Sequence, residues 1–131
     1  MKKILVPTSG TVTAFESAEY AMRVAKAIKA EIHVLHVFTE DEDPDSIKDS
    51  LHVFENASEG TLVPVYGFTA FGKVIDQIIE HAESNDINLI LMGASNGLVV
   101  EKWISHDVLG QTSVPVLVMP YQIFDEEIDE G

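Results

Sequence analysis

One loop of this sequence combines glycines with polar side chains directly after a run of Ile and Leu. Residues 93–97 read Gly-Ala-Ser-Asn-Gly. Gly93 and Gly97 would let a ligand approach the backbone closely, while Ser95 and Asn96 could donate and accept hydrogen bonds. Loops at the carboxyl ends of buried strands are where open α/β sheets bind ligands. This pattern therefore predicts noncovalent binding of a phosphate or sugar, although a tight strand-to-helix turn would use the same residues.

A second loop of similar chemistry follows the first apolar run of the chain. Residues 7–13 read Pro-Thr-Ser-Gly-Thr-Val-Thr and lead into a helical pattern. Amides at the start of a helix attract anions, so this loop is also a candidate anion site. Both loops follow strands, and we expect them to meet at the same edge of a sheet. Helix capping by Thr11 or Thr13 would explain at least one of the hydroxyl groups without a ligand.

The five histidines predict neither a metal site nor a catalytic triad. His33 and His36 are three residues apart on a predicted strand, and such residues point to opposite faces. His52, His81 and His106 fall on separate predicted helices, without a Ser, Asp or Glu at a recognisable spacing. We therefore expect the histidines to be packing residues, and we identify no catalytic or metal-binding residue.

Composition excludes several classes of function. The chain has 131 residues, no cysteine, and a formal charge of -14 from 22 acidic and 8 basic residues. This charge would repel nucleic acid and anionic membranes, and the absence of cysteine excludes disulfides and thiolate chemistry. The first apolar run is too short for a signal peptide or a membrane span, so we expect a cytoplasmic protein. We predict one domain over 1–124 and a disordered acidic tail over 125–131, with a second acidic run, 40–43, in a solvated loop.

Apolar runs alternate with helical periodicity along the chain, as in a parallel sheet covered by helices. The first predicted helix has a capping box at 13–16, Thr-Ala-Phe-Glu, and an apolar face that ends near Ile28. The third would use Phe71, Val74, Ile75, Ile78, Ile79 and Ala82, with Gly72 inside it. The predicted strands are 3–7, 31–38, 62–66, 87–92 and 115–119, and the second and fourth helices are about 45–57 and 99–109.

Six segments, spread over nearly the full chain, resemble one known family in order and spacing. They are 4–7 (Ile-Leu-Val-Pro), 18–21 (Ala-Glu-Tyr-Ala), 30–37 (Ala-Glu-Ile-His-Val-Leu-His-Val), 65–67 (Val-Tyr-Gly), 89–93 (Leu-Ile-Leu-Met-Gly) and 114–118 (Val-Pro-Val-Leu-Val). The family is the universal stress proteins. The resemblance implies an α/β fold of the adenine nucleotide alpha hydrolase-like type: a three-layer, open, twisted parallel sheet of five strands with four helices. It also implies a homodimer through the last strand, at Val116, Leu117, Val118 and Met119.

Some members of this family bind ATP, and this chain departs from their pattern in two places. Those members place the nucleotide against an Asp soon after the first strand, where this chain has Ser9. They also carry a loop of the form Gly-x2-Gly-x9-Gly-Ser/Thr after the fourth strand. Here three residues separate Gly93 from Gly97, no Gly-Ser or Gly-Thr follows, and Lys102 and Trp103 occupy the closing position. A bulky indole there could fill the phosphate site.

The resemblance therefore predicts a dimeric regulatory or interaction module with a degraded nucleotide site, and no certain cofactor. The alternative is a member that still binds ATP or another adenine nucleotide, with magnesium, and has at most weak ATPase or phosphotransferase activity. In that alternative Val37 and Met92 would flank the base. The full set of candidate binding residues is Pro7, Thr8, Ser9, Gly10, Val37, Met92, Gly93, Ala94, Ser95, Asn96 and Gly97.

A flavodoxin-like electron carrier is a further alternative, prompted by the acidic charge and the Thr-rich loop. It fits less well, because a flavin-phosphate loop needs Thr where this chain has Val12. A phosphorylated receiver domain fits worst, since the first strand does not end in the acidic pair that holds magnesium in such domains.

Overall fold

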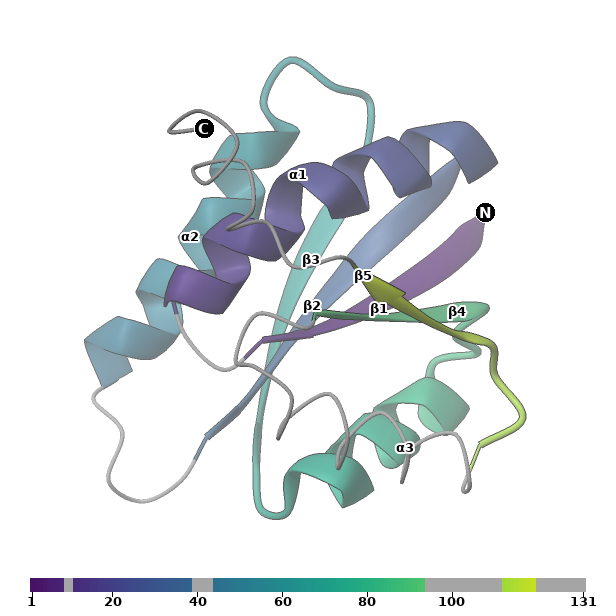
Figure 1. Ribbon diagram of the computed structural model, residues 1–131. Helices are drawn as coiled ribbons and strands as arrows, with labels where there is room; N and C mark the ends of the chain where they lie inside the picture. Colours follow the sequence, from purple (N-terminus) through teal and green to yellow (C-terminus); the bar gives the residue numbers. More distant parts are fainter. Residues whose placement is uncertain (9–10, 39–43, 94–111, 120–131) are drawn as a thin grey trace, which may run out of the picture.

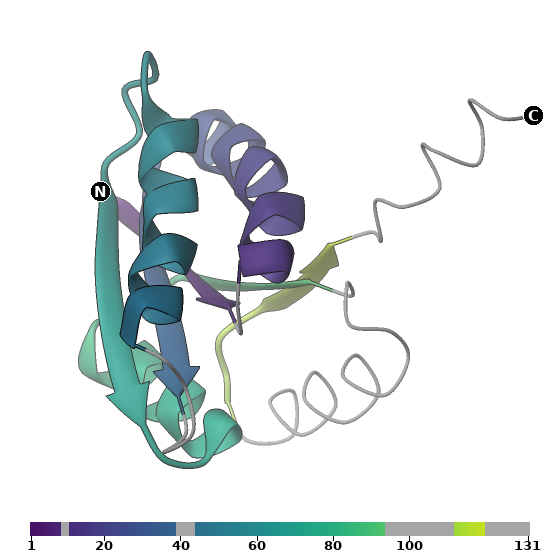
Figure 2. The same ribbon diagram turned by 90° about the vertical axis from the view of Figure 1, so that its left-hand side faces the viewer.

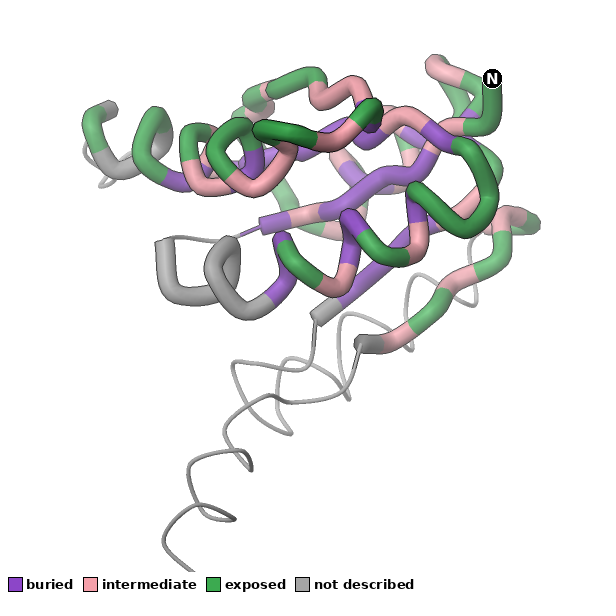
Figure 3. The backbone as a smooth tube through the Cα atoms, turned by 90° about the horizontal axis from the view of Figure 1, so that it is seen from above, coloured by how far each residue is buried: buried purple, intermediate pink, exposed green. Residues whose placement is uncertain are grey.

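Five parallel strands form one sheet, in the order β3-β2-β1-β4-β5 (Figure 1). The structure is a computed structural model that describes residues 1–8, 11–38, 44–93 and 112–119. The central strands β1, β2 and β4 are rich in Ile, Leu and Val because helices cover them on both faces. Figure 3 shows the buried stretches running along these strands. The strands are β1 (Lys2–Thr8), β2 (Ala30–Phe38), β3 (Val65–Phe71), β4 (Leu89–Gly93) and β5 (Val116–Met119).

The three described helices divide between the two faces of the sheet. Helices α1 (Thr11–Ile28) and α2 (Pro44–Ser58) pack side by side on one face, and α3 (Val74–Ser84) lies on the other (Figures 1 and 2). Alternate residues of each strand point to opposite faces, which produces two separate cores. Ile32 and Val34 of β2 belong to the core under α1 and α2, whereas Leu35 and Val37 belong to the core under α3.

The sequence predicted the fold class and the positions of four of the five strands. β1, β2, β4 and β5 each coincide with a predicted apolar run within two residues at either end, a normal uncertainty for element boundaries. The first helix begins at Thr11, so Thr13 lies inside it and the predicted capping box at 13–16 does not start the helix. The predicted fourth helix, 99–109, lies outside the described residues.

The third strand is displaced from its predicted position. It spans Val65–Phe71 instead of 62–66, and Leu62 is 99% exposed. A turn occupies the residues before it, because the hydroxyl of Thr61 donates to the Ser58 carbonyl at 2.6 Å and accepts from the Val63 amide at 3.2 Å. The predicted strand stopped at Tyr66, one residue before Gly67. In the structure Gly67 is inside the strand, where an added Cβ would lie only 3.1 Å from Cδ1 of Leu51 on α2.

The same displacement corrects the start of the third helix. Phe71 is the last residue of β3 and is exposed, so it does not belong to the buried face of α3. Gly72 forms the turn between the two elements at a φ of +135°, which only glycine adopts easily. The helix begins at Val74, and Ile78 and Ala82 are its buried residues.

Among the described residues, no helix is long and apolar enough to cross a membrane.

Candidate functional site

The carboxyl edge of the sheet brings together the described members of the predicted binding set. Thr8 ends β1, Gly93 ends β4, and Val37 is the penultimate residue of β2. Because β2, β1 and β4 are neighbours and parallel, their ends lie at one edge. Ser9, Gly10, Ala94, Ser95, Asn96 and Gly97 lie outside the described residues.

The sheet-edge residues divide between its two faces. Val37 and Met92 belong to the same buried cluster on the α3 side, and both are less than 10% exposed. Strand alternation puts Pro7 on that side as well, because Leu5, two residues earlier, is in the same cluster. Thr8 is buried on the side of α1 and α2. Val37, Pro7 and Met92 therefore come from three adjacent strands and lie on the α3 face near the carboxyl edge of the sheet.

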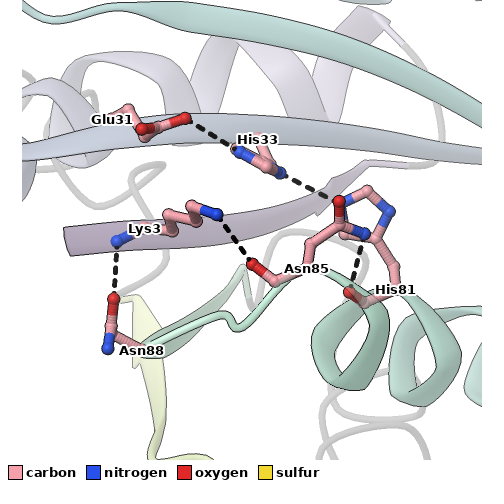
Figure 4. Close-up of polar contacts among 6 residues, drawn as sticks. All are labelled: Lys3, Glu31, His33, His81, Asn85 and Asn88. Carbon is pink, nitrogen blue, oxygen red and sulfur yellow. Dashed lines mark hydrogen bonds and ion pairs between the residues drawn. The ribbon is translucent and has the colours of Figure 1, made fainter. Parts of the chain in front are cut away.

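A second group of chemically active side chains lies away from this edge, between β2 and α3. His33 connects two partners: its Nε2 lies 3.1 Å from Oε2 of Glu31, and its Nδ1 lies 3.1 Å from Nε2 of His81 (Figure 4). Glu31 and His33 are two residues apart on β2, so they share one face of the strand. His81 comes from the last turns of α3. The result is a carboxylate–imidazole–imidazole chain.

Aromatic rings pack around the hydrogen-bonded group of Glu31, His33 and His81. His33 stacks on Phe68 of β3 with ring centroids 4.9 Å apart, and it forms a T-shaped pair with Tyr66 at a centroid distance of 5.9 Å. Phe68 also contacts the ring of His81 at 4.6 Å. His33 is 5% exposed, so its polar contacts are largely shielded from water.

The end of α3 is fixed by the same part of the sheet. The side-chain amide of Asn85 donates to the carbonyl of His81 at 3.0 Å, which caps the helix. Lys3 of β1 donates from Nζ to the Asn85 carbonyl at 3.1 Å, and its backbone amide donates to Oδ1 of Asn88 at 2.8 Å (Figure 4). These contacts tie the end of α3 to β1, the neighbour of β2 in the sheet.

Burial, and then the neighbouring His33, lower the pKa of His81 to about 4 from its ordinary value of 6.5. Both causes disfavour the charged imidazolium, the first by removing water and the second by repulsion between the two rings. At neutral pH His81 is therefore an uncharged ring.

Sequence reasoning missed this group. His33 and His36 do occupy positions of opposite orientation on β2, as expected, but His33 makes polar contacts rather than packing alone. His81 finds its partner on a strand 48 residues earlier, a separation that no local spacing reveals. The available signal was Glu31-x-His33, a carboxylate and an imidazole on one face of a strand. Among the described residues, no group of three or more metal-binding side chains is present.

Fold and sheet topology together define an α/β protein with an open parallel sheet. The chain belongs to the universal stress protein family, whose model matches residues 1–120. A universal stress protein of Methanocaldococcus jannaschii is 24% identical to it, over 90% of this chain and 81% of that protein.

Solved structures of the same family share the fold. A universal stress protein in complex with cAMP has a TM-score of 0.75 at 15% identity, covering 90% of this chain and 95% of that one. An Archaeoglobus fulgidus protein in complex with dAMP has a TM-score of 0.70 at 17% identity, covering 92% and 98%. A family member from Arabidopsis thaliana with AMP bound has a TM-score of 0.67 at 16% identity, covering 95% of each chain.

Proposed function

We propose that this protein is a noncatalytic, dimeric regulatory module of the universal stress protein family that does not hold ATP tightly. The observation that carries the proposal is the altered nucleotide motif. Ser9 stands in place of the family's Asp, and Lys102 and Trp103 stand where the closing Gly-Ser pair of the phosphate loop would be. The formal charge of -14 adds repulsion toward a triphosphate.

A second candidate is a module that binds an adenine nucleotide with fewer phosphates. The neighbours in complex with cAMP, dAMP and AMP favour it, because these ligands carry one phosphate each. Pro7, Val37 and Met92 near the carboxyl edge of the sheet could flank a base, and a single phosphate would need less of the altered loop. Under this proposal the sheet edge keeps its base site and has lost its triphosphate site.

Nucleotide titration distinguishes the two candidates. Protein purified under native conditions is denatured and its released nucleotide measured, and fresh protein is then titrated with Mg-ATP, AMP and cAMP by calorimetry. Release of little ATP, with weak or absent Mg-ATP binding, supports the first proposal. Saturable binding of AMP or cAMP supports the second, while stoichiometric and tight ATP overturns the first.

The proposed dimer uses the free edge of β5. In the described residues β5 pairs with β4 on one side only, and Leu117 in its middle is 39% exposed. An unpaired edge strand with exposed apolar side chains is a natural surface for pairing with a second copy. Supporting this, β5 carries no charged side chain.

Leu117→Asp should convert the dimer to a monomer, because it places a charge in the proposed interface. Leu62→Asp is the matched control, since Leu62 is 99% exposed and lies in the loop before the opposite edge strand, β3. Sedimentation velocity reports assembly, and circular dichroism checks that both variants remain folded. A wild type that sediments as a monomer at all concentrations contradicts the dimer.

A further inference from the structure

The Glu31–His33–His81 chain ends at a pocket between β2, β3 and α3. The pocket has a volume of about 210 Å³, and His81 forms part of its wall. Leu35, Phe68 and Ala70 provide an apolar floor, while Glu80 and Ser84 of α3 provide polar groups. Sites for drug-sized ligands are typically about 300–1,000 Å³, so this one fits a smaller molecule.

The hydrogen bonds that link Glu31, His33 and His81 determine which ring nitrogen of His81 carries the proton. The Glu31 carboxylate only accepts, so Nε2 of His33 donates to it. In a neutral His33 the other nitrogen, Nδ1, then accepts, and Nε2 of His81 must donate to it. A neutral His81 is left with Nδ1 as an acceptor. Within the described part of the chain, no hydrogen bond to this Nδ1 is present.

We propose that this pocket is a second binding site, for a small organic cation with an apolar body that donates N–H hydrogen bonds to His81 and pairs with Glu80. An amine, amidine or guanidine carries several donors and no acceptor, which matches a wall made of an acceptor nitrogen and a carboxylate. The apolar body would contact Leu35 and Phe68. The protein's charge of -14 attracts such a ligand and repels an anion of the same shape.

This proposal goes beyond the function at the sheet edge, because none of its polar groups belongs to the predicted nucleotide loops. Leu35 lies two residues before Val37 on β2, so the two sites occupy different levels of the same face. Failure of one proposal therefore leaves the other intact. A nucleotide titration and a cation titration report on them separately.

Acid should weaken binding of the cation. A proton added to the His33–His81 pair leaves Nδ1 of His81 unable to accept a hydrogen bond, and its positive charge repels the ligand. Burial, and then repulsion from His33, oppose protonation of His81. The pKa of His81, lowered to about 4, is consistent with an acceptor ring at neutral pH. The ionisable groups around the pair are Glu31 on β2, Tyr66 on β3, Lys3 on β1 and Glu80 on α3.

Benzamidine is a suitable probe, because it joins a flat apolar ring to a planar cation with several N–H donors. Long-range proton–nitrogen NMR spectra at pH 7.5 should show His81 protonated on Nε2, with its Nδ1 resonance shifting as benzamidine is added. His81→Phe should abolish binding. Glu80→Gln should weaken it by about two- to fivefold, the usual effect of an exposed charge pair.

Glu83→Gln is the matched control, because Glu83 is an exposed carboxylate on the same helix that does not line the pocket. It should leave benzamidine affinity unchanged. Benzoate is the matched anion and should not bind. The proposal is overturned if benzamidine does not bind at millimolar concentration, if Glu80→Gln and Glu83→Gln behave alike, or if benzoate binds better than benzamidine. Because Glu80 is exposed, its variant keeps the test valid even if His81→Phe fails to fold.

Discussion

At the scale of single residues, His33 and His81 show how tertiary contact changes the role of a side chain. Each is an isolated histidine in the sequence, and each would be expected to titrate near neutral pH. Packing against Phe68 and the contact with Glu31 turn them into one polar unit in which proton positions depend on each other. The coupling follows from the 3.1 Å between Nδ1 of His33 and Nε2 of His81.

The lowered pKa of His81 predicts that acid destabilises the fold. Between about 4 and 6.5 the unfolded chain binds a proton at His81 that the folded protein does not. The contribution of His81 to the free energy of unfolding is therefore fully present above pH 6.5 and is lost as the pH falls toward 4. Because the ring is only half-buried, we expect a loss on the order of 1 kcal/mol after solvent screening.

His81→Asn should flatten this dependence, whatever its effect on stability at neutral pH. The measurement is the free energy of unfolding in urea at several pH values from 7.5 to 4.5. His52→Asn is the control, since His52 is exposed and its Nε2 lies 3.8 Å from Glu55. If wild type and His81→Asn lose stability in parallel, His81 is not the group responsible.

At the scale of elements, the turn at Gly72 sets the position of the edge strand β3 relative to α3, the helix that carries His81. Gly72 has a φ of +135°, and an added Cβ would lie 3.2 Å from Nε2 of Gln77. Gly60, after α2, has a φ of +77° and open space around it. Both are turn glycines, but only Gly60 has a conformation that asparagine adopts readily.

Gly72→Ala should destabilise the protein by about 1–3 kcal/mol, because alanine cannot relax at that φ. Gly60→Asn should leave the stability of the protein nearly unchanged. Thermal and urea unfolding of the two variants would check this, and equal losses would show that the Gly72 conformation is not strained for a side chain. If α3 shifts in the Gly72 variant, its His81 resonances should move as well.

At the scale of the whole molecule, net charge opposes folding. A charge of -14 on 131 residues produces self-repulsion that the compact state feels more than the unfolded chain. The Debye length falls from about 30 Å at about 0.01 M salt to about 3 Å at about 1 M. Sodium chloride should therefore raise the unfolding temperature over this range.

A variant carrying both Glu59→Lys and Glu83→Lys tests the cause. Both residues are exposed, so the change brings net charge closer to neutrality without disturbing a core. Its unfolding temperature should be higher at low salt and should rise less with added salt than that of the wild type. A salt response identical to the wild type would mean that a local ion site, rather than global repulsion, is responsible.

Much of the fold could be predicted from the sequence because its signals are local. Runs such as Ile4 to Val6 and Leu89 to Met92 are apolar without alternation, which indicates strands covered on both faces. The carboxyl edge follows from these strands, so the positions of Thr8, Val37 and Met92 at one edge were predictable. The end of β3 was not, because Gly67 and Gly72 look alike in the sequence. Gly67 permits close approach of Leu51, whereas Gly72 forms a turn.

The sequence by itself determined the α/β architecture and the family, since both depend on periodicity or on contiguous motifs along the chain. Only the tertiary structure decided that Glu31, His33 and His81 form a chain and that His81 lines a pocket. The physical reason is distance along the chain. A strand and a helix 48 residues apart meet through the packing of Phe68 and the capping of α3, and neither contact leaves a local pattern.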